Sequence, residues 1–196
     1  DTREPRHVHG GWYDASGDCS KSLSHLSYAN FMNPQQTPLV TWALLAGRDR
    51  LPPQSKWLDE RIVDEALHGA DFLVRMQAPE GFFYTTVFDK WSKDEHQREI
   101  CSYATQKGIK SADYQAGFRQ GGGLGVAALA RAAGAHRDGA FTRAAYLERA
   151  IRGFELLERR NTDYLDDHAE NLIDHYCALL AASELHVRTG DARWRA

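Results

Sequence analysis

The sequence has few cysteines and no long apolar run. Three cysteines among 196 residues are too few and too scattered for a disulfide framework, and their odd number favours a reducing compartment. We therefore expect a cytoplasmic location, with the periplasm as the alternative. No apolar run approaches the roughly 20 residues that a transmembrane helix needs, so we expect no membrane span. The polar first residues, 1–9, carry no signal-peptide pattern.

An excess of charge of one sign is also lacking. The 24 basic and 27 acidic residues give a net charge of -3, and neither sign gathers in a tail. This balance argues against nucleic acid or an anionic membrane surface as the main partner. Aromatic residues, in contrast, make up 11% of the chain, and several lie in segments without periodicity. Flat side chains in loops suit the apolar faces of sugar rings, although most aromatic residues in proteins belong to the core.

Apolar residues recur at the 3.6-residue spacing of a helix in five segments. The pattern predicts helices over residues 37–47, 59–77, 114–134, 139–160 and 168–188. Thr37 and Pro38 suit the start of the first helix. Asp166 or Asp167 can cap the last helix, and Gly190 can end it. The apolar face of that helix is formed by Leu172, Ile173, Tyr176, Leu179, Leu180 and Ser183.

Two long stretches, residues 1–35 and 78–113, interrupt the helices and read as long ordered loops. Within the second stretch, the β-branched and aromatic run 81–88 predicts a short strand or hairpin arm. No alternation of strands and helices predicts a parallel sheet. The expected fold class is all-α, with helical hairpins in series that close into a toroid or stack as a solenoid. No clean repeat of 34 or 40 residues is present, which weakens the solenoid.

The most informative run is GGWYDASGDCSK, residues 10–21. It places the carboxylates of Asp14 and Asp18 four residues apart, with Gly17 between them to allow a tight turn. Two carboxylates near one water molecule can orient it and accept its proton, which an inverting glycosidase needs on one face of the sugar. Trp12 and Tyr13 are candidates for the wall of such a pocket. The alternative is an ordinary turn rich in Asp and Ser.

This run resembles the GGWYDAGD signature of family 9 glycoside hydrolases. The resemblance implies that Asp18 is the general base and that Asp14 helps to hold the water. This chain has one extra residue, Ser16, so its loop must bulge relative to the family motif. Lys21 and the RTGD run at 188–191 also match family features.

The resemblance further implies an (α/α)6 barrel of twelve helices. Residues 1–196 would be the N-terminal portion of one catalytic domain and would supply its first five or six helices, with the remainder of the domain as their packing partner. The general acid of the family is a Glu near the end of the domain, and no Glu of this chain matches its motif. The 196-residue piece alone is therefore expected to be inactive.

Three further segments, HLSYANFMNPQQTP, GFFYTTVFDKWS and DYQAGFRQGGG, resemble the exo-β-D-glucosaminidase branch found in bacterial chitin-degradation clusters. That branch releases glucosamine from the non-reducing end of chitosan oligosaccharides, which would then be the substrate. An ammonium group at C2 of the sugar favours a nearby carboxylate. The alternatives are an endo-β-1,4-glucanase, a non-catalytic helical domain that binds oligosaccharides, and a helical scaffold for protein partners.

Three more residues are candidates for substrate binding. Trp91 and Tyr84 belong to the second long loop, which borders the substrate cleft in the family. Arg119 lies at a loop-to-helix junction, where contact with sugar hydroxyls and a surface or capping role are both reasonable.

We expect no cofactor and no metal. The GGGLGVAA run at 121–128 lacks the preceding strand of a dinucleotide site, and its small residues instead predict close helix packing. The His7 and His9 pair lacks the further ligands of a zinc site.

Overall fold

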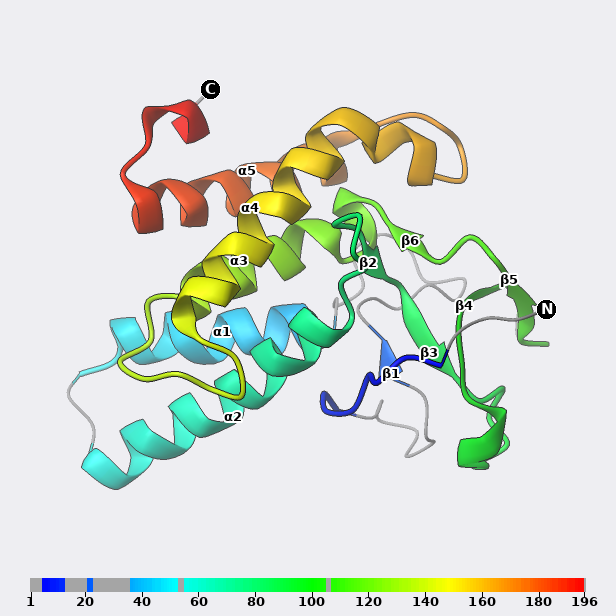
Figure 1. Ribbon diagram of the computed structural model, residues 1–196. Helices are drawn as coiled ribbons and strands as arrows, with labels where there is room; N and C mark the ends of the chain where they lie inside the picture. The colour runs from blue at the N-terminus through cyan, green and yellow to red at the C-terminus, as the bar shows by residue number, and fades with distance from the viewer. Residues whose placement is uncertain (1–4, 13–20, 23–35, 53–54, 105–106, 196) are drawn as a thin grey trace.

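The computed structural model describes residues 5–12, 21–22, 36–52, 55–104 and 107–195 (Figure 1). Five helices form most of it: α1 (Gln36–Arg50), α2 (Lys56–Arg75), α3 (Gly122–Ala132), α4 (Arg143–Arg160) and α5 (Leu172–Thr189). Six short strands accompany them: β1 (Lys21–Ser22), β2 (Phe83–Tyr84), β3 (Thr86–Phe88), β4 (Glu99–Ala104), β5 (Ile109–Ser111) and β6 (Gln115–Ala116). The chain is therefore mainly helical, and its expected fold class needs one correction, because the loops carry a small sheet.

Local chemistry explains most helix ends. The side chains of Ser55 and Thr142 accept hydrogen bonds from the first turns of α2 and α4, and this type of cap contributes about 1 kcal/mol. Asn171 caps α5 and forms a capping box with Asp174, while Gly190 ends the helix at a φ of 71°. The prediction that Gly190 ends this helix is thus confirmed. The predicted cap at residue 166 or 167 is wrong, because α5 begins only at residue 172.

The predicted helix 114–134 begins eight residues late, at Gly122. Residues 115–116 pair with β2, and residues 118–120 form a single 3-10 turn. Gly121 then takes a φ of 110°, which strains any residue with a Cβ atom. The chain is extended and then turns sharply before α3 can begin.

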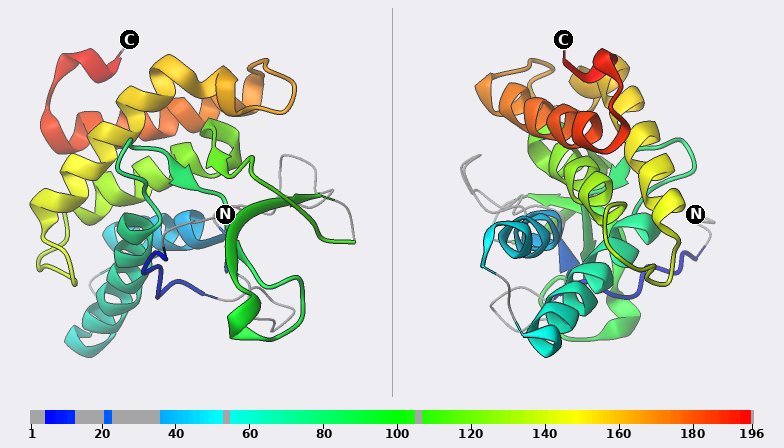
Figure 2. Two further views of the ribbon diagram at one scale, coloured as in Figure 1. Left: turned by 45° about the vertical axis from the view of Figure 1, so that its right-hand side comes forward. Right: turned by 90° about the vertical axis from the view of Figure 1, so that its left-hand side faces the viewer.

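The helices form two layers (Figures 1 and 2). Helix α3 packs against α1 on one side and α5 on the other, while α2 and α4 lie across the same face of this row. Helices α1, α3 and α5 all begin at the end of the molecule where the strands lie (Figure 1). The strands of the second long loop, together with β1, therefore lie at one end of the helical row.

Small residues bring α3 and α5 close together, as predicted. A Cβ atom added to Gly123 would lie 2.9 Å from the Cβ atom of Cys177, and one added to Gly122 would lie 2.8 Å from the backbone oxygen of Ala116. Both approaches are too short for real side chains. The glycine run therefore serves backbone packing.

The face on which α5 packs differs from the predicted one. Leu172, Tyr176 and Leu179 are 78%, 40% and 67% exposed. The buried side of α5 contains small or polar residues instead, among them Cys177, Ala181, Ala182 and Glu184, together with Leu185. The close contact with the glycines of α3 selects these small residues, which leaves an apolar stripe of Leu172, Tyr176, Leu179 and Val187 on the outer side.

The strands form an antiparallel sheet in the order β1-β3-β4-β5, and β2 pairs separately with β6. The expected strand or arm over residues 81–88 is confirmed by β2 and β3. Strand β1 comes from far away in the sequence and pairs Lys21 with Val87 and Ser22 with Thr86. This pairing fixes the chain that follows residues 10–20 against the edge of β3.

Two buried carboxylates connect the helices. Glu184 of α5 accepts a hydrogen bond of 2.7 Å from Trp42 Nε1 of α1 and lies 3.2 Å from Arg131 Nε of α3. Asp71 of α2 accepts a bond of 2.5 Å from the hydroxyl of Tyr146 in α4, and bonds of 2.8 and 3.2 Å from the backbone of residues 140 and 141. Around them, buried side chains such as Phe72, Leu129 and Leu157 form one core, each contributing roughly 1.5–3 kcal/mol.

Candidate functional site

The segment that leads into the carboxylate run is attached to α2. Gly10 and Gly11 have φ values of 98° and 68°. A Cβ atom on Gly11 would lie 2.8 Å from the ring of Phe72, so only glycine permits this approach. The carbonyl of Gly11 also accepts a hydrogen bond of 3.2 Å from His68 Nε2.

Trp12 is fixed at the same place. Its Nε1 donates a hydrogen bond of 2.6 Å to Glu65 Oε1, and its ring meets the ring of His68 edge-on at 5.8 Å. The ring also lies over Gly69, where a Cβ atom would come within 2.6 Å. The predicted wall residue Trp12 is thus held by three contacts with one helix.

Tyr13, Asp14 and Asp18 lie outside the described residues, as do Ser16 and Gly17. The described chain ends on α2 at Trp12 and resumes at Lys21 in β1, beside Val87. The two predicted catalytic carboxylates therefore belong to an eight-residue stretch between two placed ends, one on the helical layer and the other on the sheet.

Trp91 follows β3, the strand that pairs with β1. Its ring meets Phe88 edge-on at 5.1 Å and Tyr103 at 5.9 Å, and Phe88 stacks on Tyr103 at 4.1 Å. The turn is unusual because Lys90, Trp91 and Lys93 all have φ values near 60°. The buried carboxylate of Asp89 holds it by accepting hydrogen bonds from the backbone of residues 91 and 93, at 2.9 and 3.1 Å.

This geometry presents Trp91 as a supported aromatic ring that is 38% exposed. A side chain held from behind by two aromatic rings needs little ordering when a flat ligand stacks on it. Strained backbone of this kind is common at functional sites.

Tyr84 lies in a separate aromatic cluster, formed by Phe82, Tyr84, Tyr114 and Tyr164. Its ring is 5.3 Å from Phe82 and 5.6 Å from Tyr114, and the guanidinium of Arg6 lies 5.2 Å from its centre. Burial raises the pKa of the Tyr84 hydroxyl, since only 7% of the residue is exposed. Of this cluster only Tyr84 was predicted for the site. Phe82 lies two residues before it, and Tyr114 and Tyr164 come from distant segments that no sequence pattern relates to it.

Arg119 is buried among protein acceptors. Its guanidinium donates to Asp174 at 2.8 Å, to Asp167 at 2.7 Å and to the carbonyl of Ala169 at 2.9 Å. Burial opposes the charge, but the hydrogen bonds with Asp167 and Asp174 outweigh it, so the pKa of Arg119 is raised. The side chain fastens the start of α3 to α5 and the loop before it. Contact with sugar hydroxyls stays a prediction.

The described residues contain no group of three or more His, Cys, Asp or Glu side chains arranged to hold a metal ion. The ring centres of His7 and His9 lie 4.2 Å apart, with the rings tilted by 36°. Cys101 and Cys177 are buried thiols. Within the placed part of the chain, no helix is long and apolar enough to cross a bilayer.

The placed ends of the carboxylate run thus lie on α2, at Trp12, and on β3, at Lys21, and the supported ring of Trp91 follows the same strand β3. Comparison of the chain with protein-family models and with curated proteins finds no match.

Proposed function

We propose that these residues form the N-terminal part of an inverting glycoside hydrolase domain similar to family 9, in which Asp18 is the general base and Asp14 helps to position the water. The observation that carries the proposal is the run GGWYDASGD at residues 10–18. An acid–base pair on opposite faces of a sugar is the requirement of an inverting mechanism. The run supplies the base side of that pair.

The placement of the flanking residues supports this assignment. Trp12 is fixed on α2, and β1 is fixed on β3. A catalytic carboxylate has to be held near its productive position, and rigid elements on both sides of a short segment serve this need. An ordinary surface turn needs no such attachment.

The helix arrangement supports the proposed (α/α)6 barrel. Alternate helices α1, α3 and α5 form one layer, and α2 and α4 form a second layer over it. This is the alternation of inner and outer helices that a toroid of helical hairpins requires. The apolar stripe on α5 lies on its outer side, where a further helix from the remainder of the domain would bury Leu172, Tyr176 and Leu179.

The proposed substrate is a chitosan oligosaccharide, cleaved to release glucosamine from its non-reducing end. Trp91 would stack on a sugar ring, and the carboxylates of residues 14 and 18 would attract the C2 ammonium group. Tyr84, in β2, and Arg119, just before α3, are the other proposed substrate-binding residues. A neutral glucan, the substrate of the endoglucanase alternative, would not use this charge pairing.

The test is the substitution Asp18→Asn in a protein that carries the whole catalytic domain. Loss of a general base typically costs about 10²–10⁴-fold in rate, so kcat on chitosan dimers should fall by at least about 100-fold without loss of folding. The control is Asp163→Asn, which alters an exposed carboxylate paired with Arg160 and should leave kcat unchanged. Near-normal turnover by Asp18→Asn would remove the assignment.

Two further readouts separate the alternatives. An inverting enzyme that cleaves a β-linkage releases the α-anomer first, which proton NMR detects directly. Cellooligosaccharides cleaved faster than chitosan oligosaccharides would favour the endoglucanase. Binding of chitosan oligosaccharides without any cleavage by the whole domain would favour the non-catalytic binding protein.

A further inference from the structure

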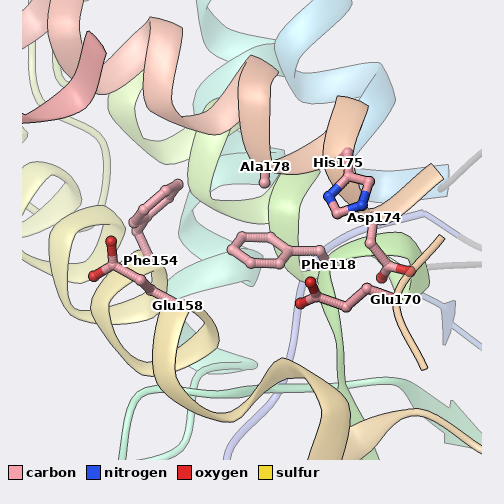
Figure 3. A pocket seen from close by; sticks show the side chains of 7 residues that line it. All are labelled: Phe118, Phe154, Glu158, Glu170, Asp174, His175 and Ala178. Atoms are coloured by element: carbon pink, nitrogen blue, oxygen red, sulfur yellow. The ribbon is translucent and has the colours of Figure 1, made fainter. Parts of the chain in front are cut away.

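A pocket of about 190 Å³ lies between α4 and α5 (Figure 3). Two rings that line it, those of Phe118 and Phe154, are buried and meet edge-on at 5.6 Å. A third lining residue, Asp174, is bound by Arg119. These three side chains serve the packing of the helices. One face of α2 differs, because it is occupied by the segment that leads into the carboxylate run.

Four residues of this α2 face approach Gly11 or Trp12. They are spaced as i, i+3, i+4 and i+7, which places them on one side of the helix: Glu65, His68, Gly69 and Phe72. His68 and Phe72 hold the backbone at Gly11, through its carbonyl and through the close approach to the ring. Glu65 and Gly69 hold the indole of Trp12. Backbone and side chain therefore have separate attachments.

The indole of Trp12 lies along one turn of α2. Its Cη2 and Cζ3 atoms are the ring atoms nearest to Gly69, and its Nε1 donates to Glu65, four residues earlier in the helix. Packing on Gly69 limits how close the ring can come to the helix, whereas the hydrogen bond fixes which way the ring is turned. An indole has one donor, so no second hydrogen bond from the ring can set this orientation.

Glu65 is available for this single contact. Within the placed part of the chain, Trp12 is its only hydrogen-bond partner, at 2.6 Å. Arg61 lies one turn earlier, where an i, i+4 ion pair with Glu65 would form on an ordinary helix surface. It pairs with Asp64 instead, at 2.6 Å. A charged acceptor also binds an N–H group more strongly than a neutral one does. The carboxylate therefore serves Trp12 and not the surface of its own helix.

We propose that Glu65 is a positioning residue for substrate binding, which holds the indole of Trp12 in the orientation in which it forms a wall of the sugar site. The inference rests on the proposed hydrolase, in which Trp12 contacts the substrate. Because His68 and Phe72 hold the backbone separately, loss of Glu65 turns the ring and leaves Gly11 in place. A wall residue contacts the sugar in the ground state and the transition state alike, so its misplacement raises KM and leaves kcat unchanged.

The test uses the whole catalytic domain and chitosan dimers. Glu65→Leu removes the acceptor and keeps a good helix former. KM should rise about three- to tenfold, the factor that corresponds to one hydrogen bond, and kcat should stay within about twofold. Glu65→Gln retains an oxygen acceptor and should restore most of the affinity. The control is Glu60→Leu, which removes another carboxylate of α2, 3.8 Å from Lys56, and should leave KM unchanged.

A double-mutant cycle separates this role from a general effect on α2. Trp12→Phe keeps an aromatic ring but has no Nε1–H group, so Glu65→Leu in this background should raise KM no further. An equal rise in both backgrounds would mean that Glu65 acts through the helix or on the substrate itself, and would overturn the inference. Should Glu65→Leu fail to fold, Trp12→Phe removes the same hydrogen bond, and an unchanged KM in that variant would overturn the inference as well.

The failure of this inference differs from the failure of the proposed function. An unchanged KM in Glu65→Leu, in a domain that Asp18→Asn inactivates, would overturn the role of Glu65 and leave the general base in place. The two substitutions are read in different constants, KM for Glu65 and kcat for Asp18. Absence of any hydrolysis by the unaltered domain would overturn both.

Discussion

The bond between Tyr146 and Asp71 offers the sharpest test of how the helical layers are held together. The substitution Tyr146→Phe removes one oxygen atom and keeps the buried ring. The lost bond, 2.5 Å long, runs from a hydroxyl to a carboxylate, and such bonds contribute about 1.5–3 kcal/mol. Asp71 keeps its two backbone donors, from residues 140 and 141. We therefore expect the free energy of unfolding to fall by about 2 kcal/mol.

The assay is urea unfolding followed by circular dichroism. The urea concentration at the midpoint should fall. The slope of the unfolding free energy against urea concentration should stay constant, because the surface exposed on unfolding is unchanged. Tyr114→Phe is the matched control. Its hydroxyl makes no hydrogen bond within the described residues, and the ring is half-buried. We expect a change within about 0.5 kcal/mol.

The same bond predicts a dependence on alkaline pH. Burial and the hydrogen bond to Asp71 raise the pKa of Tyr146 above its ordinary value of 10.0. The unfolded chain then loses this proton at a lower pH than the folded chain does, so stability is lost as pH rises above about 10. Tyr146→Phe should show less of this loss. A destabilisation below about 0.5 kcal/mol, or an identical alkaline slope in both proteins, would refute the reasoning.

Four further substitutions test helix packing, a buried ion pair and a helix cap. Gly123→Ala adds a methyl group where α5 leaves no room, and it should destabilise the protein by about 1–3 kcal/mol. Gly47→Ala has nothing within 4 Å of the added methyl group, and it should stabilise the protein by about 0.5–1 kcal/mol. Thermal unfolding should therefore show stability changes of opposite sign for the two variants. Arg119→Met leaves Asp174 buried without its cation and should cost about 3–5 kcal/mol in urea unfolding. Asn171→Ala removes the cap of α5 and should cost about 1 kcal/mol, measured in the same way.

The helices were largely predictable because amphipathic spacing is a local property. Helices α2 and α4 begin within a few residues of the predicted positions, and their caps follow known preferences. The predicted start of α3 failed because residues 115–116 pair with β2, a contact that no local pattern announces. The predicted apolar face of α5 failed because close packing on Gly123 favours small residues over large ones.

The sheet was mostly missed for a similar reason. Strand β4 (Glu99–Ala104) lacks a clear alternation of polar and apolar residues, and its pairing with β3 depends on the tertiary fold. Strand β1 has only two residues, which carry no pattern of their own.

The candidate site shows the same division between local and distant information. The motif at residues 10–18 is recognisable from the sequence, and the glycines before it are explained by the approach to Phe72. The support of Trp91 by Phe88 and Tyr103 depends on a strand pairing and was not predictable. The ion pair of Arg119 with Asp174 joins residues far apart in the sequence, so it was not predictable from the loop-to-helix junction alone.

Asp71 also limits how the molecule can move. The carboxylate of α2 holds the backbone that links α3 to α4, so it ties the second helical hairpin to the first. If one hairpin moved away from the other, the buried carboxylate of Asp71 would lose its hydrogen-bond donors. A hinge motion at this connection is therefore energetically unfavourable. The paired hairpins should therefore behave as a rigid block, and adjustments to a bound molecule should fall to the loops at the other end of the helices.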